Sequence, residues 1–182
     1  MKKWIAMALA LLMMGTLAAC GNKQTDDQNP DQNTDVDLTA FYNQMAEEHN
    51  WYEEGAEEVP DTEDALMMAT IEGDMLESYY PGLSAIPTKQ FIAKTPLISA
   101  VVNEIVLMEC EKEEDAKAAA EILQKRIDYQ VGDDENPGGA LYPETVASWK
   151  KAKVIQNGAF VALIAADECQ ADLEKQVNDL FA

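Results

Sequence analysis

Nucleophilic catalysis needs a thiol or hydroxyl beside a base, and this sequence contains few bases that suit the role. His49 is the only histidine in the 182 residues, and it stands at the end of a predicted helix beside Glu47 and Glu48. Cys110 or Ser99 would be a nucleophile only if His49 reached it, and nothing in their spacing indicates this. A single histidine also excludes a histidine-rich metal site. We therefore expect His49 to be a solvent-exposed residue at the helix end, and we predict no catalytic residues, no metal ligands and no cofactor.

Carboxylates are abundant, with 34 Asp and Glu against 13 Lys and Arg, which gives a formal net charge of −21. Paired carboxylates perform glycoside chemistry, but among so many acids no particular pair stands out. The negative charge argues against nucleic acid as a partner, and against a membrane surface held by charge alone. An acidic surface favours basic partners or bound calcium, or it simply keeps an exported domain soluble.

Aromatic residues beside prolines are the candidate binding groups of the sequence. Two tyrosines precede a Pro-Gly pair, and a third precedes another proline. Loops held by a scaffold often carry binding groups, and tyrosine offers a large contact area at low entropic cost. The alternative, that these rings only seal the core, stays open. The predicted binding residues are Tyr79, Tyr80, Tyr142 and Trp149.

The amino-terminal segment has the form of a secretory signal. Lys2 and Lys3 precede an uncharged apolar stretch at residues 4–16, which is too short to span a bilayer. Leu17-Ala18-Ala19-Cys20 follows and resembles the lipobox of bacterial lipoproteins, in which the cysteine is acylated and becomes the first residue. The resemblance implies a lipoprotein signal peptide at residues 1–19, cleavage between Ala19 and Cys20, and a lipid on Cys20. An ordinary signal peptide followed by a free cysteine is the alternative.

A lipid on Cys20 would hold the protein on the extracytoplasmic face of the cell membrane, because two or three acyl chains bind a bilayer firmly. Residues 20–37 comprise this cysteine and a polar tether. The tether has one apolar side chain besides proline, and such a composition does not order itself. Residues 38–182 remain, and their number suits one domain with one core.

The domain is predicted to be α+β, with an antiparallel sheet of about four strands in hairpin pairs and helices packed on one face. Pro96 suggests that its strand lies at the sheet edge, and Asn157-Gly158 predicts a tight hairpin. Asp37 is expected to cap the first helix, and Asp167 the last, with Gln170 returning the cap. Helices are expected from about 38 to 48, 72 to 80, 113 to 127 and 144 to 151 and after 167, and strands at 91–98, 104–110, 153–155 and 160–164.

Several short segments share a pattern with a known family. They are Tyr79-Tyr80-Pro81-Gly82, Lys94-Thr95-Pro96-Leu97-Ile98, Asn103-Glu104-Ile105, Leu141-Tyr142-Pro143-Glu144 and Ala152-Lys153-Val154. In these segments the chain resembles a domain family of unknown function found in lipoproteins of low-GC Gram-positive bacteria. The resemblance covers roughly residues 37–182 and implies a small extracytoplasmic α+β domain with no known activity. The acidic stretch at 53–64 departs from the family pattern.

Together these features predict a lipid-anchored extracytoplasmic module that binds an envelope protein, a peptide or a sugar. An envelope enzyme that uses carboxylates is one alternative. An accessory subunit of a membrane transporter is another, although about 145 residues are few for a two-lobed solute receptor. Cys110 and Cys169 are expected to stay unbridged, because a domain with a full core needs no disulfide.

Overall fold

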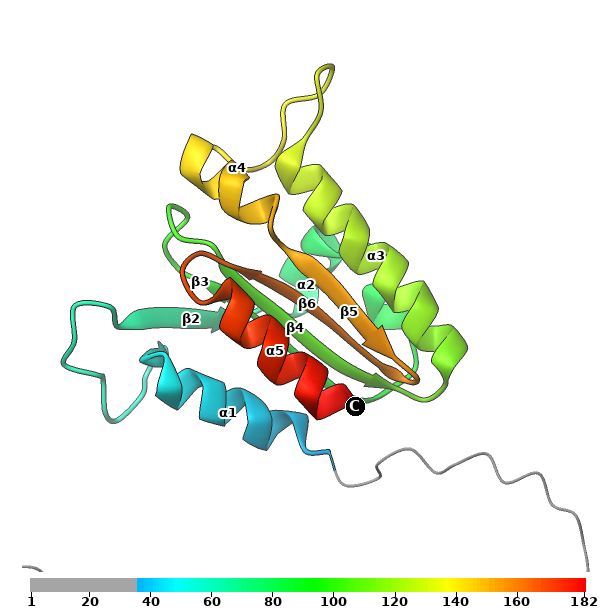
Figure 1. Ribbon diagram of the computed structural model, residues 1–182, viewed down its shortest axis with the longest axis horizontal. Coiled ribbons are helices and arrows are strands. Elements are labelled where there is room, and N and C mark those ends of the chain that lie inside the picture. Colours follow the sequence, from blue (N-terminus) through cyan, green and yellow to red (C-terminus); the bar gives the residue numbers. More distant parts are fainter. Residues whose placement is uncertain (1–35) are drawn as a thin grey trace, which may run out of the picture. The chain divides into compact units, whose positions relative to one another are not determined.

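Two apolar segments form the centre of the fold. β4 (Asn103–Cys110) and β6 (Phe160–Ala166) pair antiparallel, and nearly all of their side chains are buried. Successive side chains of a strand point to opposite faces, so an uninterrupted apolar run indicates a strand that is covered on both sides. The structure is a computed structural model that describes residues 36–182, and these two strands lie inside its sheet (Figure 1).

The sheet has six strands in the order β1-β2-β3-β4-β6-β5. β1 (Trp51–Glu53) and β2 (Leu66–Thr70) pair in parallel. The remaining pairs, which include β3 (Thr88–Pro96) and β5 (Lys153–Asn157), are antiparallel. The α+β class is confirmed, but the sheet is mixed and has six strands instead of about four. The two additional strands are short, and they make β3 an inner strand in which Pro96 is the last residue.

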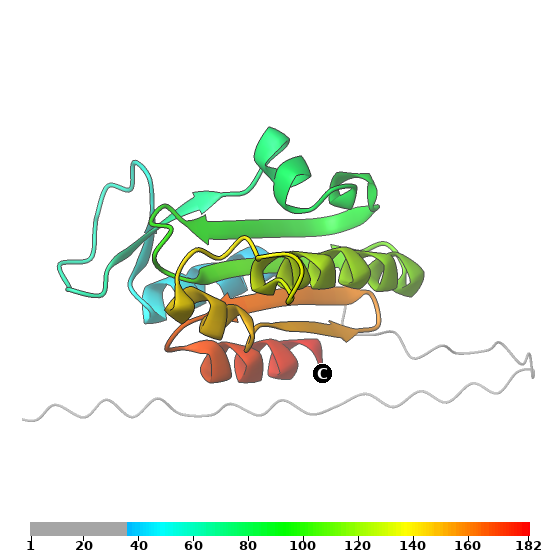
Figure 2. The ribbon, with the colours of Figure 1, turned by 90° about the horizontal axis from the view of Figure 1, so that it is seen from above.

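Helices cover both faces of the sheet, which corrects the prediction that they pack on one face. α2 (Gly73–Tyr79), α3 (Glu113–Val131) and α4 (Pro143–Trp149) pack on the face that carries Val106 and Leu163. The other face, with Ile105 and Ile164, is covered by α1 (Leu38–Glu48) and α5 (Gln170–Phe181). In Figure 2, α3 and α4 lie in front of the strands and α1 lies behind them. The physical reason is that β4 and β6 are apolar on both faces.

The predicted hairpin joins β5 to β6, but its turn is shifted by one residue. Asn157 is still part of the ladder, opposite Phe160, so the two loop residues are Gly158 and Ala159. Gly158 has a φ of 54°, a left-handed conformation that a glycine at the first position of a two-residue loop adopts easily. The glycine was therefore the informative residue of the Asn-Gly pair.

The predicted cap is present at α1 and absent at α5. The Asp37 carboxylate accepts hydrogen bonds from the backbone N–H groups of Thr39 and Ala40, each at 2.9 Å, and so caps α1. Asp167 does not cap α5. Its carboxylate accepts a hydrogen bond from the backbone N–H of Val102 at 3.2 Å and thus joins the end of β6 to the start of β4.

Both cysteines in the described part of the chain are free, as predicted. Cys110 is the last residue of β4, whereas Cys169 follows β6, and in an antiparallel pair these positions lie at opposite ends of the sheet. Within residues 36–182, no helix is both long enough and apolar enough to cross a membrane. The predicted signal peptide, its cleavage at Ala19–Cys20 and the lipid on Cys20 lie outside the described residues.

Candidate functional site

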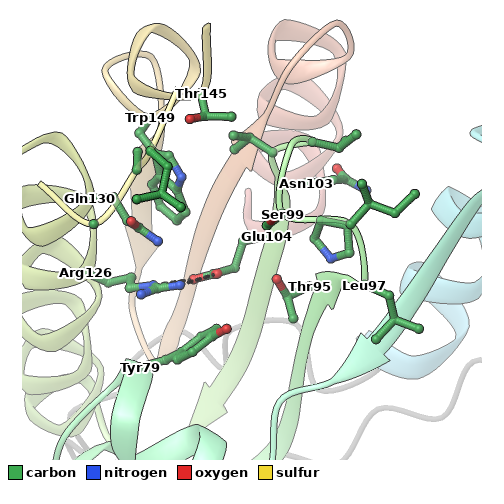
Figure 3. A pocket seen from close by; sticks show the side chains of 17 residues that line it. Tyr79, Thr95, Leu97, Ser99, Asn103, Glu104, Arg126, Gln130, Thr145 and Trp149 are labelled. Atoms are coloured by element: carbon green, nitrogen blue, oxygen red, sulfur yellow. Dashed lines mark hydrogen bonds and ion pairs between the residues drawn. The ribbon is translucent and has the colours of Figure 1, made fainter. Parts of the chain in front are cut away.

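A cavity of about 290 Å³ opens at the end of the sheet where β3 ends and β4 begins. We call it the Arg126 pocket. Its walls come from the end of α2, the β3–β4 loop and the start of β4. The last turns of α3, the loop after it, and α4 complete the walls (Figure 3). The lining residues that matter here are Tyr79, Leu97, Glu104, Arg126, Gln130, Leu141 and Trp149.

An ion pair lies at the base of this pocket. Arg126 donates from Nε to Glu104 Oε1 at 2.9 Å and from Nη2 to Oε2 at 2.8 Å, a bidentate arrangement drawn in Figure 3. The two side chains are only 7% and 3% exposed. The hydroxyl of Tyr80 donates a further hydrogen bond to Glu104. Both oxygens of the carboxylate are therefore occupied, as a buried charge requires.

Their surroundings keep the Arg126 guanidinium charged and the Tyr80 hydroxyl protonated. Burial would by itself lower the pKa of Arg126, but the hydrogen bonds and charge of Glu104 outweigh it and raise this pKa. Burial, and then the charge of Glu104, hold the pKa of Tyr80 well above its ordinary value of 10.0. At neutral pH the guanidinium is charged and the phenol is protonated, so both can donate their hydrogen bonds to Glu104.

Aromatic rings surround the guanidinium. Its carbon Cζ lies 3.9 Å from the centre of the Tyr79 ring and 5.4 Å from that of Trp149. Such cation–π contacts contribute roughly 1–2 kcal/mol when they are desolvated. Figure 3 shows Tyr79 on one side of Arg126 and Trp149 on the other, so the arginine is held between elements far apart in the sequence.

The mouth of the pocket is apolar and exposed. Leu97 is 53% exposed, Ile98 57% and Leu141 79%, and all three line the cavity. Deeper inside, the side-chain amide of Gln130 makes no hydrogen bond to any described residue, and its Oε1 is buried. An apolar rim with a few convergent polar groups is the usual composition of a ligand site.

The four predicted binding residues take different positions. Tyr79 and Trp149 line the pocket, on either side of Arg126. Tyr80 is completely buried and supports Glu104 from within the core. Tyr142 stands at the start of α4 with a 46% exposed side chain, and it is not among the residues that line the pocket.

The sequence reasoning missed Glu104 and Arg126, although the sequence carries a signal for each. Arg126 is the only arginine of the chain, and it lies beside Leu123 and Ile127 on the apolar face of α3. Glu104 is a buried charge that directly precedes the apolar run from Ile105 to Met108 in β4. A buried charge needs a partner, so two isolated opposite charges in apolar segments predict a pair.

His49 is not the solvent-exposed residue that we expected. Its side chain is 20% exposed, its ring stacks on Trp51 at 5.2 Å, and it lines a second cavity of about 320 Å³. We call this the His49 pocket. It opens at the same end of the sheet as the Arg126 pocket, and Val101, Val102 and Asn103 line both. Its remaining lining residues are Trp51, Asp64, Leu66, Asp167, Glu168 and Cys169.

A third cavity is lined by Lys94 of β3, which is the only buried lysine among the residues that the structure describes. Its ammonium donates to Glu53 and, at 2.9 Å, to Thr70 Oγ1, and it lies 5.5 Å from the centre of the Tyr42 ring. Burial, and then the charge of Glu53, raise the pKa of Tyr42. Glu53 balances the charge of Lys94, Thr70 accepts a hydrogen bond from it, and the Tyr42 ring lies beside it. Because Tyr42 belongs to α1, this cluster joins α1 to the β1–β3 edge.

Comparison with known proteins places the chain in a family without a known activity. No curated protein and no solved structure matches it significantly. A family profile described as "Domain of unknown function (DUF4358)" matches residues 61–166, which include every residue of the Arg126 pocket. This match confirms that the chain resembles a domain family of unknown function. Since the match extends over more than half of the 182 residues, the chain belongs to the DUF4358 family.

Proposed function

We propose that this protein is a lipid-anchored extracytoplasmic binding module and that the Arg126 pocket is its binding site. The observation that carries the proposal is the combination of an exposed apolar rim with a base whose charges are fully paired. Such a pocket presents no net charge to a ligand. It favours a largely apolar or uncharged ligand with a small number of polar groups.

Binding without chemistry follows from the titratable groups in the pocket. Of the carboxylates in the described part of the chain, Glu104 alone lines it, and both of its oxygens accept hydrogen bonds from Arg126. A general base must be within reach of the proton that it removes and must be free to take it. Glu104 lacks this freedom. The hydroxyls of Thr95 and Ser99 in the same walls are available to hydrogen-bond a ligand, whereas the hydroxyl of Thr145 is engaged with the backbone of Tyr142.

The polar groups indicate how a ligand would be oriented. The amide of Gln130 has no partner among the described residues, and Figure 3 shows it beside Arg126 and Trp149. A ligand amide would satisfy Gln130 while its apolar part lies against Leu97 and Leu141. Of the three targets suggested by the sequence, a peptide segment of an envelope protein fits this pattern better than a sugar, because the rim is apolar.

The lipid anchor rests on the sequence. The basic start, the apolar stretch and Leu17-Ala18-Ala19-Cys20 occur in the order that a lipoprotein signal requires. The resemblance to lipoproteins of low-GC Gram-positive bacteria supports the same location. Anchoring at Cys20 leaves residues 21–37 as the connection between the membrane and α1, which begins at Leu38.

Site-specific photo-crosslinking in cells tests the binding site. A benzoyl-phenylalanine at position 141, on the rim, should form an adduct with an envelope component, because Leu141 is 79% exposed and lines the pocket. The same group at position 59 is the control, since Val59 is 55% exposed and lies outside the pocket. Leu97→Ser should reduce the adduct at position 141. Equal adducts at the two positions would contradict the proposal.

Metabolic labelling with an alkyne fatty acid tests the anchor. The wild-type protein should incorporate the label and fractionate with membranes, and Cys20→Ala should do neither. Cys169→Ala is the matched control, because it removes a thiol from the folded domain and leaves the lipobox intact. Absence of label from the wild-type protein would refute the anchor without bearing on the pocket.

A further inference from the structure

The His49 pocket contains polar groups that the fold leaves without partners. Asn103 is only 3% exposed, and its amide nitrogen lies 3.6 Å from the sulfur of Met68. Its Oδ1 is buried and accepts no hydrogen bond within the described part of the chain. Nε2 of His49 is also buried without a hydrogen bond, 3.6 Å from Asp172 Oδ2. Unpartnered buried acceptors are uncommon, and each needs a reason.

The position of Asn103 at the start of β4 explains which pocket its side chain serves. Its neighbour Glu104 points to the α3 face, where it meets Arg126. Side chains alternate along a strand, so Asn103 points to the opposite face, toward Met68 and the side of the sheet that α1 covers. The side chain of Asn103 therefore faces the side of the sheet on which the His49 pocket lies, and Asn103 lines that pocket as well as the Arg126 pocket.

The charges around the His49 pocket all have the same sign. Asp64, Asp167 and Glu168 line it, and no lysine or arginine among residues 36–182 does. None of these three carboxylates forms an ion pair with any described residue. Trp51 adds an aromatic ring to the wall. Carboxylates, an amide oxygen and an indole all attract cations.

The spacing of these groups favours a molecular cation over a metal ion. Within residues 36–182, no group of three or more His, Cys, Asp or Glu side chains is placed to hold one metal ion. A cavity of about 320 Å³ has room for a flexible organic chain whose N–H donors reach separate acceptors.

We propose that the His49 pocket binds an organic cation with several N–H donors, namely a primary ammonium or a guanidinium on a flexible chain. The ammonium lies among Asp64, Asp167 and Glu168 and donates to Asn103 Oδ1. The carbon chain packs against Trp51. This site is separate from the Arg126 pocket and does not depend on the function proposed for that pocket.

The cysteine in the wall is consistent with a cation site and unsuited to nucleophilic catalysis. Burial, and then the charges of Asp172, Asp167 and Glu168, raise the pKa of the Cys169 thiol above its ordinary value of 9.0. The thiol therefore stays protonated at neutral pH. A reactive thiolate, in contrast, is stabilised by nearby positive charge, which this site lacks among the described residues. The surroundings that suppress a thiolate are those that favour a bound cation.

Isothermal titration calorimetry with the full-length protein in neutral detergent micelles tests the proposal. The probes are spermidine and a capped Ala-Lys-Ala tripeptide, which distinguish a free amine from a lysine side chain carried by a peptide. The same tripeptide with an acetylated lysine is the uncharged control. Either amine, or both, should bind in a one-to-one complex, and the acetylated peptide should not bind.

Matched double variants separate the pocket from the overall acidity. Asp64→Asn with Glu168→Gln removes two pocket charges, and Asp64→Asn keeps an oxygen for its hydrogen bond from Asn50. Glu57→Gln with Glu63→Gln removes two charges from the exposed loop nearby, outside the pocket. We expect the first pair to weaken amine binding on the order of tenfold and the second pair to weaken it less than about twofold.

Three results would overturn the proposal. The first is equal weakening by the two double variants, because the amine would then be responding only to net charge. The second is displacement of the amine by an equimolar amount of Ca²⁺, which would indicate a metal-ion site. The third is the absence of binding by both amines at millimolar concentration. Circular dichroism of each variant shows whether the fold is retained, so that a loss of binding is attributed to the pocket.

Discussion

The Arg126 pocket and the His49 pocket lie at the same end of one sheet and share the wall from Val101 to Asn103, yet their charges are arranged in opposite ways. In the first, one arginine and one glutamate pair with each other. In the second, three carboxylates have no cationic partner among the described residues. The difference follows from burial. A buried charge must be paired for the domain to fold, whereas an exposed charge can remain free for a ligand.

The elements that carry the charges explain this division. Glu104 belongs to the central strand β4, where water cannot reach it, so its partner must come from the fold itself. Asp64 and Glu168 belong to connecting segments and are exposed. Loops present functional groups to solvent on a scaffold that other residues hold together. One end of the sheet thus combines a buried charge that is paired within the fold with exposed carboxylates that have no cationic partner among the described residues.

Breaking the pair in the Arg126 pocket should have the largest effect. Arg126→Leu leaves Glu104 buried without its cation, and the free energy of unfolding should fall by about 3–5 kcal/mol. Urea denaturation followed by circular dichroism measures this change. Glu168→Gln, in the His49 pocket, should change the free energy of unfolding by less than about 0.5 kcal/mol, as is usual for an exposed site. A similar loss in both variants would contradict the comparison.

Removing both members of the pair should restore most of the lost stability. When Arg126→Leu is combined with Glu104→Leu, no charge remains buried, and apolar replacements of buried pairs are often neutral. The double variant should therefore be more stable than Arg126→Leu alone in the same urea experiment. If it is less stable, the two residues are not coupled as the structure indicates.

Tyr80→Phe should have an intermediate effect, because it removes the hydroxyl that donates to Glu104. We expect a loss of about 1–3 kcal/mol at neutral pH, the cost of leaving a buried charged acceptor with one donor fewer. The contribution should also depend on pH. The pKa of Tyr80 is raised in the folded state, so its stabilising effect is complete below pH 10.0 and decreases as the pH rises further.

The pH dependence distinguishes this tyrosine from other groups. Cys110, whose pKa is raised by burial to about 11, and Tyr42 also favour the protonated folded state. The wild-type protein therefore loses stability above about pH 9 for several reasons. The difference between wild type and Tyr80→Phe isolates Tyr80, and it should shrink above pH 10.0. A difference that stays constant would show that the phenol is not coupled to Glu104.

Asn103→Leu should have a smaller effect of the opposite sign. The unpartnered Oδ1 lowers stability, so an apolar side chain of similar size should raise the free energy of unfolding by roughly 1 kcal/mol. The same substitution should weaken amine binding in the His49 pocket. Urea denaturation and calorimetry measure the two effects. A loss of stability together with unchanged binding would mean that Asn103 is a structural residue.

Reductant should have no effect on stability. Cys110 and Cys169 are free and lie at opposite ends of the sheet. A bridge closing a loop of this length would contribute about 4 kcal/mol in the chain-entropy model. Thermal unfolding with and without dithiothreitol should therefore give the same midpoint, and a clear fall in the midpoint would contradict the structure.

The sequence predicted the elements that have strong local signals. The apolar face of α3, the apolar runs of β4 and β6 and the Asp37 cap all depend on neighbouring residues, and each is present. β1 and β2 depend on pairing between distant segments, and three and five residues are too few to show a periodicity. α1 and α5 were predicted, but their place on the second face was not, although β6 and the middle of β4 are apolar on both faces, a pattern that indicates cover on both sides.

The candidate sites were only partly predictable. Tyr79 and Trp149 were selected as aromatic residues, and the structure brings them to one pocket. Their common neighbour is Arg126, which the sequence did not predict as a site residue. Its role depends on pairing with Glu104, and Glu104 lies on a strand about twenty residues earlier in the chain. The His49 pocket was not foreseen at all. It joins the end of α1, the start of β2 and the segment after β6, and no local pattern relates these three segments.

The most direct test of the comparison uses the tryptophan of each pocket. Trp51 lines the His49 pocket and Trp149 lines the Arg126 pocket, so their indole N–H signals in a ¹H–¹⁵N NMR spectrum report on the two sites in one sample. Trp51→Phe and, where the signal peptide is retained, Trp4→Phe assign the signals. We expect spermidine added to the full-length protein in neutral detergent micelles to shift the Trp51 signal in a saturable manner and to leave the Trp149 signal in place. Movement of the Trp149 signal instead, or equal movement of both, would contradict the division between paired and free charges.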